Sequence, residues 1–171
     1  MPTHAGLVSL LALAVIGLSA PALAVAAGGT DPAPRTWPAA EPEDPEYTAA
    51  VAAIKRGDFG GAIRRLEGVV ARDGASADAY NWLAYAIRRN GDPARSILLY
   101  QKALALDSKH RGAHEYVGEA YLALDNLAKA KEHLARLDSL CFFPCSEYRD
   151  LKKAVEAYEK SGGKPKPAAG R

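Results

Sequence analysis

The chain has 171 residues, of which 49% are hydrophobic and 25% are charged, and its formal net charge at pH 7 is +2. These values are typical of a globular protein, so they exclude a wholly disordered chain, and the length excludes a large multidomain assembly. The small net charge gives no strong attraction to nucleic acid or to an anionic membrane surface.

The N-terminal segment has the composition of an export signal. Residues 7–24 are apolar and uncharged, and they end in the small residues A-L-A at 22–24, which fit a secretory cleavage site. We therefore predict a signal peptide over residues 1–24, cleaved after Ala24 or Ala27, and a periplasmic or secreted mature protein. The alternative is an uncleaved anchor in the inner membrane, because about 18 apolar residues is the lower limit for spanning a bilayer.

Two further stretches are rich in proline or glycine. Residues 25–45 contain five prolines and few large apolar residues, so they predict an extended linker. Residues 161–171 combine glycine and proline with three basic residues, and they predict a disordered basic tail. The folded domain is therefore expected over residues 46–160.

Residues 77–110 show a helical period with a central break. Apolar residues recur at three- and four-residue steps from Tyr80 to Ile87, and again from Ile97 to Leu106. Between these runs lies N-G-D-P at residues 90–93, in which the glycine can end one helix, the aspartate can cap the next and the proline fits its first position. The segment predicts a hairpin of two helices.

The same pattern returns when the sequence is shifted by 34 residues in either direction, which predicts three hairpins over residues 43–144. Two places of each unit hold small residues, namely Ala50, Ala84 and Gly118 at the eighth place and Ala62, Ser96 and Ala130 at the twentieth. We expect the two helices of each hairpin to cross closely at these places. Residues 145–160 predict one more amphipathic helix, which would cover the apolar flank of the last hairpin.

The repeated unit resembles the tetratricopeptide repeat, which carries Trp or Tyr at place 4, Leu-Gly/Ala at places 7 and 8, Tyr at 11 and Ala at 20. The middle unit matches with Tyr80 and Leu83-Ala84, and the third matches with Tyr121 and Ala130. The first unit is the least similar, because Glu46 stands at its place 4. The resemblance implies an all-α fold, a right-handed superhelical array of about three helix-turn-helix hairpins with a C-terminal capping helix.

In this family the first helix of each hairpin lines a concave groove that binds a partner. The places that usually face the groove are held here by Tyr47, Lys55, Asn81, Tyr85, Arg88, Arg89, Glu115 and Glu119. Aromatic and arginine side chains are frequent anchors of protein interfaces. The resemblance therefore implies a protein–protein interaction scaffold or adaptor, which binds a segment of a protein or peptide partner. With the predicted export signal, we expect it to act in the periplasm or cell envelope.

Motifs of catalysis are missing from the sequence. It contains no glycine-rich phosphate loop, no H-E-x-x-H and no G-x-S-x-G, and its acidic residues are scattered singly. We therefore expect no enzyme activity and no cofactor. We also expect no nucleic-acid partner, and no membrane span once the signal is cleaved.

The chain has two cysteines, Cys141 and Cys145, in the motif C-F-F-P-C. In an exported protein such a pair is most simply a structural disulfide, and Pro144 would interrupt the helix so that the sulfurs can meet. The alternative is a thiol-dependent redox or metal-handling helper, in which the two thiols act with a histidine. Two thiols and one uncertain histidine are a weak metal signature, so we assign no metal site.

Overall fold

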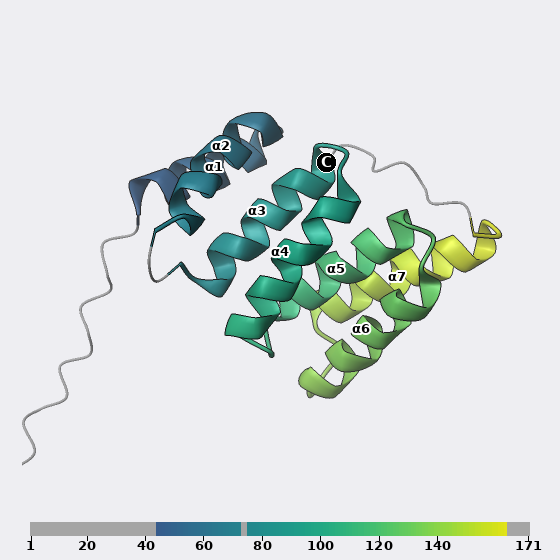
Figure 1. Ribbon diagram of the computed structural model, residues 1–171. Helices are drawn as coiled ribbons and strands as arrows, with labels where there is room; N and C mark the ends of the chain where they lie inside the picture. The colour runs from purple at the N-terminus through teal and green to yellow at the C-terminus, as the bar shows by residue number, and fades with distance from the viewer. Residues whose placement is uncertain (1–43, 73–74, 164–171) are drawn as a thin grey trace, which may run out of the picture. The chain divides into compact units, whose positions relative to one another are not determined.

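The computed structural model describes residues 44–72 and 75–163, and within these ranges it is helical without strands (Figure 1). Its helices are α1 (Pro45–Lys55), α2 (Phe59–Val70), α3 (Ala77–Arg89), α4 (Pro93–Leu106), α5 (Arg111–Ala123), α6 (Leu127–Leu140) and α7 (Ser146–Lys160). The predicted signal peptide, nearly all of the predicted linker and most of the predicted tail lie outside the described residues. No helix in the described ranges is both long and apolar enough to cross a membrane.

The helices form three successive hairpins, α1 with α2, α3 with α4 and α5 with α6, and each hairpin packs against the next (Figure 1). The last helix, α7, packs against both α5 and α6. The predicted all-α array of three hairpins and a C-terminal capping helix is therefore confirmed. Helix α1 begins at Pro45, one residue before the predicted start of the folded domain.

The turn inside each hairpin uses the same local chemistry at a spacing of 34 residues. Gly57, Gly91 and Asp125 adopt positive φ angles of 78°, 101° and 59°, which end the first helix of each hairpin. The next residue in each hairpin caps the second helix by accepting a backbone N–H on its side chain, and these caps are Asp58, Asp92 and Asn126. The repeat in sequence is thus a repeat of turn geometry.

The small residues of each unit lie in the core. Ala50, Ala84, Ala62, Ser96 and Ala130 are 0% exposed. Gly118, the remaining member of the set, is also buried, but its nearest contact differs from the prediction. A Cβ atom placed on Gly118 would lie 2.6 Å from Cδ2 of Leu151, which belongs to α7 and not to α6. The glycine therefore sets the approach of α7 to α5, where Leu151 is 0% exposed.

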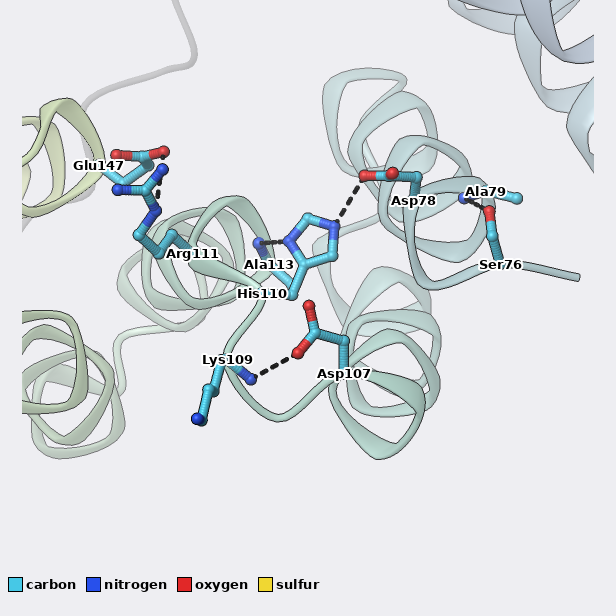
Figure 2. Close-up of polar contacts among 9 residues, drawn as sticks. All are labelled: Ser76, Asp78, Ala79, Asp107, Lys109, His110, Arg111, Ala113 and Glu147. Atoms are coloured by element: carbon cyan, nitrogen blue, oxygen red, sulfur yellow. Dashed lines mark hydrogen bonds and ion pairs between the residues drawn. The ribbon is translucent and has the colours of Figure 1, made fainter. Parts of the chain in front are cut away.

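Polar contacts join the starts of α3, α5 and α7 along one edge of the array (Figure 2). The His110 ring caps α5, because its Nδ1 accepts the Ala113 N–H at 3.1 Å. Its Nε2 then carries the hydrogen and donates to Asp78 of α3 at 3.0 Å. Farther along this edge, Arg111 of α5 forms an ion pair with Glu147 of α7 at 3.7 Å. These contacts link the N-terminal ends of α3, α5 and α7.

The link between α6 and α7 is a short loop with two exposed aromatic rings. The structure joins Cys141 to Cys145 by a disulfide with an S–S distance of 2.12 Å. Between them Phe142 and Phe143 are 95% and 76% exposed, and their ring centroids lie 4.9 Å apart. The cysteine pair thus closes the loop that precedes the capping helix.

We predict opposite effects for two glycine-to-alanine substitutions within helices. Gly118→Ala should lower the free energy of unfolding by about 1 kcal/mol, because overpacking against the buried Leu151 exceeds the gain in helix propensity. Gly68→Ala should raise it by up to about 1 kcal/mol, since an added Cβ meets no atom within 4 Å there. Urea denaturation of both variants checks this. A Gly118→Ala protein as stable as Gly68→Ala would contradict the tight contact.

Candidate protein-interaction site

Three aromatic rings gather around the ring of Tyr85 on α3. Its ring centroid lies 6.4 Å from that of Phe59, 5.6 Å from that of Trp82 and 4.9 Å from that of Tyr116. All four side chains are half-buried, so each keeps part of its surface open to solvent. We call these four rings, together with Arg88 and Arg89, the Tyr85 cluster. It joins α2, α3 and α5.

The two arginines of the cluster have different environments. Nη1 of Arg89 donates to the Tyr85 hydroxyl at 2.8 Å, and its guanidinium carbon lies 4.9 Å from the Phe59 ring centroid. Arg88 lies over the rings of both Tyr85 and Tyr116, at 5.4 and 5.8 Å, and forms an ion pair with Glu119 at 2.8 Å. The Arg88 side chain is only 10% exposed. Arg88 therefore holds α3 to α5, while Arg89 makes no ion pair within the described part of the chain.

Helix geometry explains why these side chains meet. Arg88 and Arg89 follow Tyr85 by three and four residues, so the three side chains lie on one face of α3. Glu119 stands one repeat after Tyr85, at the same place of the next unit, and therefore faces this surface from α5. The cluster is thus a product of the 3.6-residue helical period and of the 34-residue repeat.

Two predicted groove residues carry buried polar atoms that find no hydrogen-bond partner. Within residues 44–72 and 75–163, the buried side-chain atoms without a partner are Oδ1 of Asn81, Nε of Arg88 and the hydroxyl of Tyr100. Asn81 is one helical turn before Tyr85 and is 3% exposed. Arg88 and the Tyr100 hydroxyl interact with each other. Buried polar atoms of native proteins are nearly always satisfied, so Oδ1 of Asn81 is the atom beside the cluster that a ligand donor would stabilise.

Glu115 of α5 is also largely buried, with 8% exposure. Burial raises the pKa of its carboxyl group to about 8, and the nearby carboxylates of Glu119, Asp150 and Glu147 act in the same direction. The pKa of the Tyr116 hydroxyl is likewise raised, by burial first and then by Glu115. The negative charge of this surface therefore depends on pH in a range where ordinary glutamates are always ionised.

The remaining predicted groove residues lie on α1. Tyr47 is half-buried and packs against the same core cluster as Tyr85 and Trp82. Lys55 is exposed at the C-terminal end of α1, and its side chain makes no hydrogen bond or ion pair with any residue of the described ranges. The structure thus brings Tyr85, Arg88, Arg89 and Glu119 into contact, and it leaves Lys55 apart from them.

Sequence reasoning did not select three rings of the cluster, those of Phe59, Trp82 and Tyr116. A signal for two of them was present, because Tyr116 follows Trp82 by 34 residues, so that the same place holds an aromatic residue in successive repeats. Phe59 opens α2, the second helix of its hairpin, and the groove places of the family are on first helices. Its contribution depends on how α2 lies beside α3.

An apolar cavity lies away from the Tyr85 cluster. A cavity of about 360 Å³ opens between α2 and α4, and its lining is mainly apolar, with Val70, Leu83, Leu98 and Leu99. None of the predicted groove residues lines it. Across residues 44–72 and 75–163, no group of three or more His, Cys, Asp or Glu side chains is arranged to hold a metal ion.

Comparison with known proteins identifies the family that has this architecture. A family model described as tetratricopeptide repeat matches residues 47–111 and residues 88–139, together more than half of the chain. Tetratricopeptide repeat protein 1 of Schizosaccharomyces pombe (strain 972 / ATCC 24843) is 29% identical over 91 residues, which are 50% of this chain. This chain spans only 9% of the length of that protein.

A solved structure agrees at the level of the fold. The type III secretion chaperone SycD of Yersinia enterocolitica, crystallised in complex with a peptide of the translocator YopD, has a TM-score of 0.58 to this chain at 18% sequence identity. The similarity covers 68% of this chain and 88% of SycD. The repeated hairpins, their turn chemistry and the family match together show that the chain belongs to the tetratricopeptide repeat family.

Proposed function

We propose that the protein is an interaction scaffold or adaptor of the periplasm or cell envelope, and that it binds a segment of a protein or peptide partner at the Tyr85 cluster. The observation that carries this proposal is the combination of half-exposed aromatic rings with the Arg89 guanidinium, which has no carboxylate partner in the described residues, and the unpartnered Oδ1 of Asn81. Tyrosine, tryptophan and arginine are the residues on which interface energy concentrates.

The polar atoms suit an extended segment of polypeptide. A carboxamide oxygen such as Oδ1 of Asn81 accepts a backbone N–H, and the Arg89 guanidinium can donate to a carbonyl or carboxylate oxygen. The aromatic rings beside them would cover an apolar side chain of the same segment. SycD, which has a similar fold, was crystallised with a peptide, and this supports peptide binding by such an array.

Charge indicates what else the segment contains. Arg89 and Lys55 hold the same place in successive repeats, and neither has an ion pair within the described residues. Arg88 is already neutralised by Glu119. We therefore expect the partner segment to carry an acidic residue next to its apolar residue. The acidic side chain could form an ion pair with Lys55 of α1 or Arg89 of α3. Location in the envelope is supported by the composition of residues 1–24, which lie outside the described part of the chain.

Photo-crosslinking in the exporting cell tests where the partner binds. A benzophenone amino acid at Lys55 or at Ala123, both exposed at the same repeat place as Arg89, should give a discrete adduct that mass spectrometry identifies. The same group at Leu98, which is 63% exposed on α4, is the control and should not give this adduct. Adducts from Leu98 alone would place binding on the other side of the array and overturn the assignment.

We predict that Arg89→Glu weakens binding of the identified partner peptide by at least about tenfold, because it removes a cation and a contact with Tyr85. Arg95→Glu is the matched control, since Arg95 is an exposed arginine of α4 that pairs with Glu67. Titration calorimetry measures both affinities, and thermal melting shows whether both variants are folded. Equal affinities would exclude the Tyr85 cluster as the site. Arg88 is unsuited to this test because its buried ion pair holds α3 to α5.

We predict that Glu115→Gln stabilises the protein more as pH rises. The pKa of Glu115 is raised from 4.5 to about 8, so between these values the folded chain keeps a proton that the unfolded chain has lost, and stability falls as pH increases. At pH 9 the variant should exceed the parent by at least about 1 kcal/mol, and near pH 4.5 the difference should be small. Urea denaturation at both pH values measures this, and a difference independent of pH would contradict it. Glu119→Gln, which breaks the ion pair with Arg88, should give no such gain.

The cysteine pair separates the scaffold from the thiol-dependent helper. In a scaffold, Cys141→Ser with Cys145→Ser should lower the free energy of unfolding by about 2 kcal/mol, the loop-entropy value for so short a ring, and should leave partner affinity unchanged. The intact mass of the exported protein should be that of the oxidised, metal-free chain beginning after Ala24 or Ala27. A reduced chain that carries a metal, or a double variant that stays folded but loses its activity in the cell, would favour the helper.

A further inference from the structure

Two histidine rings meet between α5 and α6 in the third hairpin. Nδ1 of His114 lies 2.9 Å from Nδ1 of His133, and Nε2 of His114 lies 3.2 Å from the carbonyl oxygen of Ser108 in the α4–α5 turn. The Tyr121 ring stacks on His133 with a centroid distance of 5.7 Å. His114 is 7% exposed. The pair therefore connects three segments in a place with little access to water.

The geometry limits how many protons the pair can hold. The Ser108 carbonyl can only accept, so Nε2 of His114 carries a hydrogen and donates it. Nδ1 of neutral His114 is then an acceptor, and Nδ1 of His133 donates across the 2.9 Å contact. One additional proton can bind Nε2 of His133 without disturbing this bond. A second must bind Nδ1 of His114, where two N–H donors would then face each other.

The surroundings of His114 do not compensate for that second proton. Burial lowers its pKa, and the positive charge of Arg136 from α6 and the nearby His110 add to this effect. The Ser108 carbonyl and Asp107, at the end of α4, act in the opposite direction, but the net pKa remains below the ordinary value of 6.5.

The surroundings of His133 act in the same sense. Burial and the neighbouring His114 lower its pKa to about 4. Glu132 favours the charged ring and Lys129 disfavours it, and both lie on α6 itself. Tyr121, the ring that covers His133 from α5, offers no negative charge below pH 7.

The middle hairpin has no such titrating group at the matching place. Tyr80 stands one repeat before His114, and its hydroxyl donates to the Val70 carbonyl at 3.5 Å, as His114 does to Ser108. A tyrosine hydroxyl does not change its charge between pH 4 and 7. Because histidine stands at this place in the third hairpin, the charge of that hairpin's core can change between pH 4 and 7, whereas that of the middle hairpin cannot.

We propose that the third hairpin is an acid-sensitive element, in which α5 and α6 separate when the His114–His133 pair takes up its second proton. Each hairpin of a repeat array contacts only its neighbours, so one hairpin can open while the others stay packed. Because α5 supplies Tyr116 to the Tyr85 cluster and Glu119 to the ion pair with Arg88, opening would remove one side of that surface and release a bound segment. Only this last consequence rests on the proposed function.

Hydrogen exchange and ring NMR on the full chain test the opening without any partner. The unfolded chain takes up protons at pH 6.5 and the folded pair does so only at lower pH, so the third hairpin loses stability as pH falls from 6.5 toward 4. Glu115 on α5 stabilises the fold as pH falls over the same interval, so the comparison uses the Glu115→Gln chain as its parent. In that chain, amide protection in α5 and α6 should fall at least about tenfold more than in α1 and α2 between pH 6.5 and 4.5, after correction for intrinsic exchange rates. The rings of His114 and His133 should titrate below the ordinary histidine value of 6.5.

Two histidine-to-asparagine variants isolate the pair. His133→Asn keeps an N–H donor near the position of Nδ1 and also offers a carbonyl, so it accepts either protonation state of His114 and should remove the extra loss of protection. His110→Asn retains a good helix cap and removes only a minor contribution to the lowered pKa of His114, so it should keep most of the parent's loss of protection. Equal loss of protection in all hairpins of the parent, or an unchanged loss in His133→Asn, would overturn the proposal. If His133→Asn does not fold, the parent chain still provides a test. The proposal would be overturned if the His114 and His133 rings took up protons near pH 6.5 while the amides of α5 and α6 stayed protected.

Discussion

The array depends on close contact between helices at the places where each repeat carries a small residue. Ala84 and Ser96 are 0% exposed in the middle hairpin, and no larger side chain could be accommodated there without moving the helices apart. The spacing of the first helices follows from this packing. Only when α3 and α5 lie this close can the rings of Tyr85 and Tyr116 approach to 4.9 Å, with Arg88 bridging to Glu119 across them. The candidate surface is therefore a consequence of the smallest side chains in the core.

The hairpins could be predicted from the sequence because their turns rest on local chemistry. Gly91 takes a positive φ angle, Asp92 caps α4 and Pro93 begins it, as the order of these residues indicates. The prediction was less complete where the contact depends on distant parts of the chain. Gly118 was expected to face the second helix of its own hairpin, yet its nearest contact is Leu151 of α7. The repeat pattern describes contacts within and between hairpins, so it could not predict how α7, which follows the last repeat, packs against α5.

In the predicted groove, too, contacts within one helix could be predicted from the sequence, whereas burial by other helices could not. Tyr85, Arg88 and Arg89 meet because their spacing within one helix requires it, and the repeat adds Glu119 from the next helix. Burial could not be predicted in this way, since the 8% exposure of Glu115 depends on the neighbouring helices that cover it. A place in a repeat specifies the direction of a side chain, but the accessibility of that side chain depends on its neighbours. The binding role of these residues remains a prediction.

Glu115 and the His114–His133 pair make α5 the helix on which opposite effects of pH meet. Above pH 4.5 the raised pKa of Glu115 makes the fold less stable with each rise in pH, up to about 8. Below 6.5 the lowered pKa values of the two histidines make it less stable with each fall in pH. Between these two values the effects of the carboxyl group and of the imidazole rings oppose each other. The stability of the third hairpin therefore depends on pH from both directions, and so does the surface that α5 shares with α3.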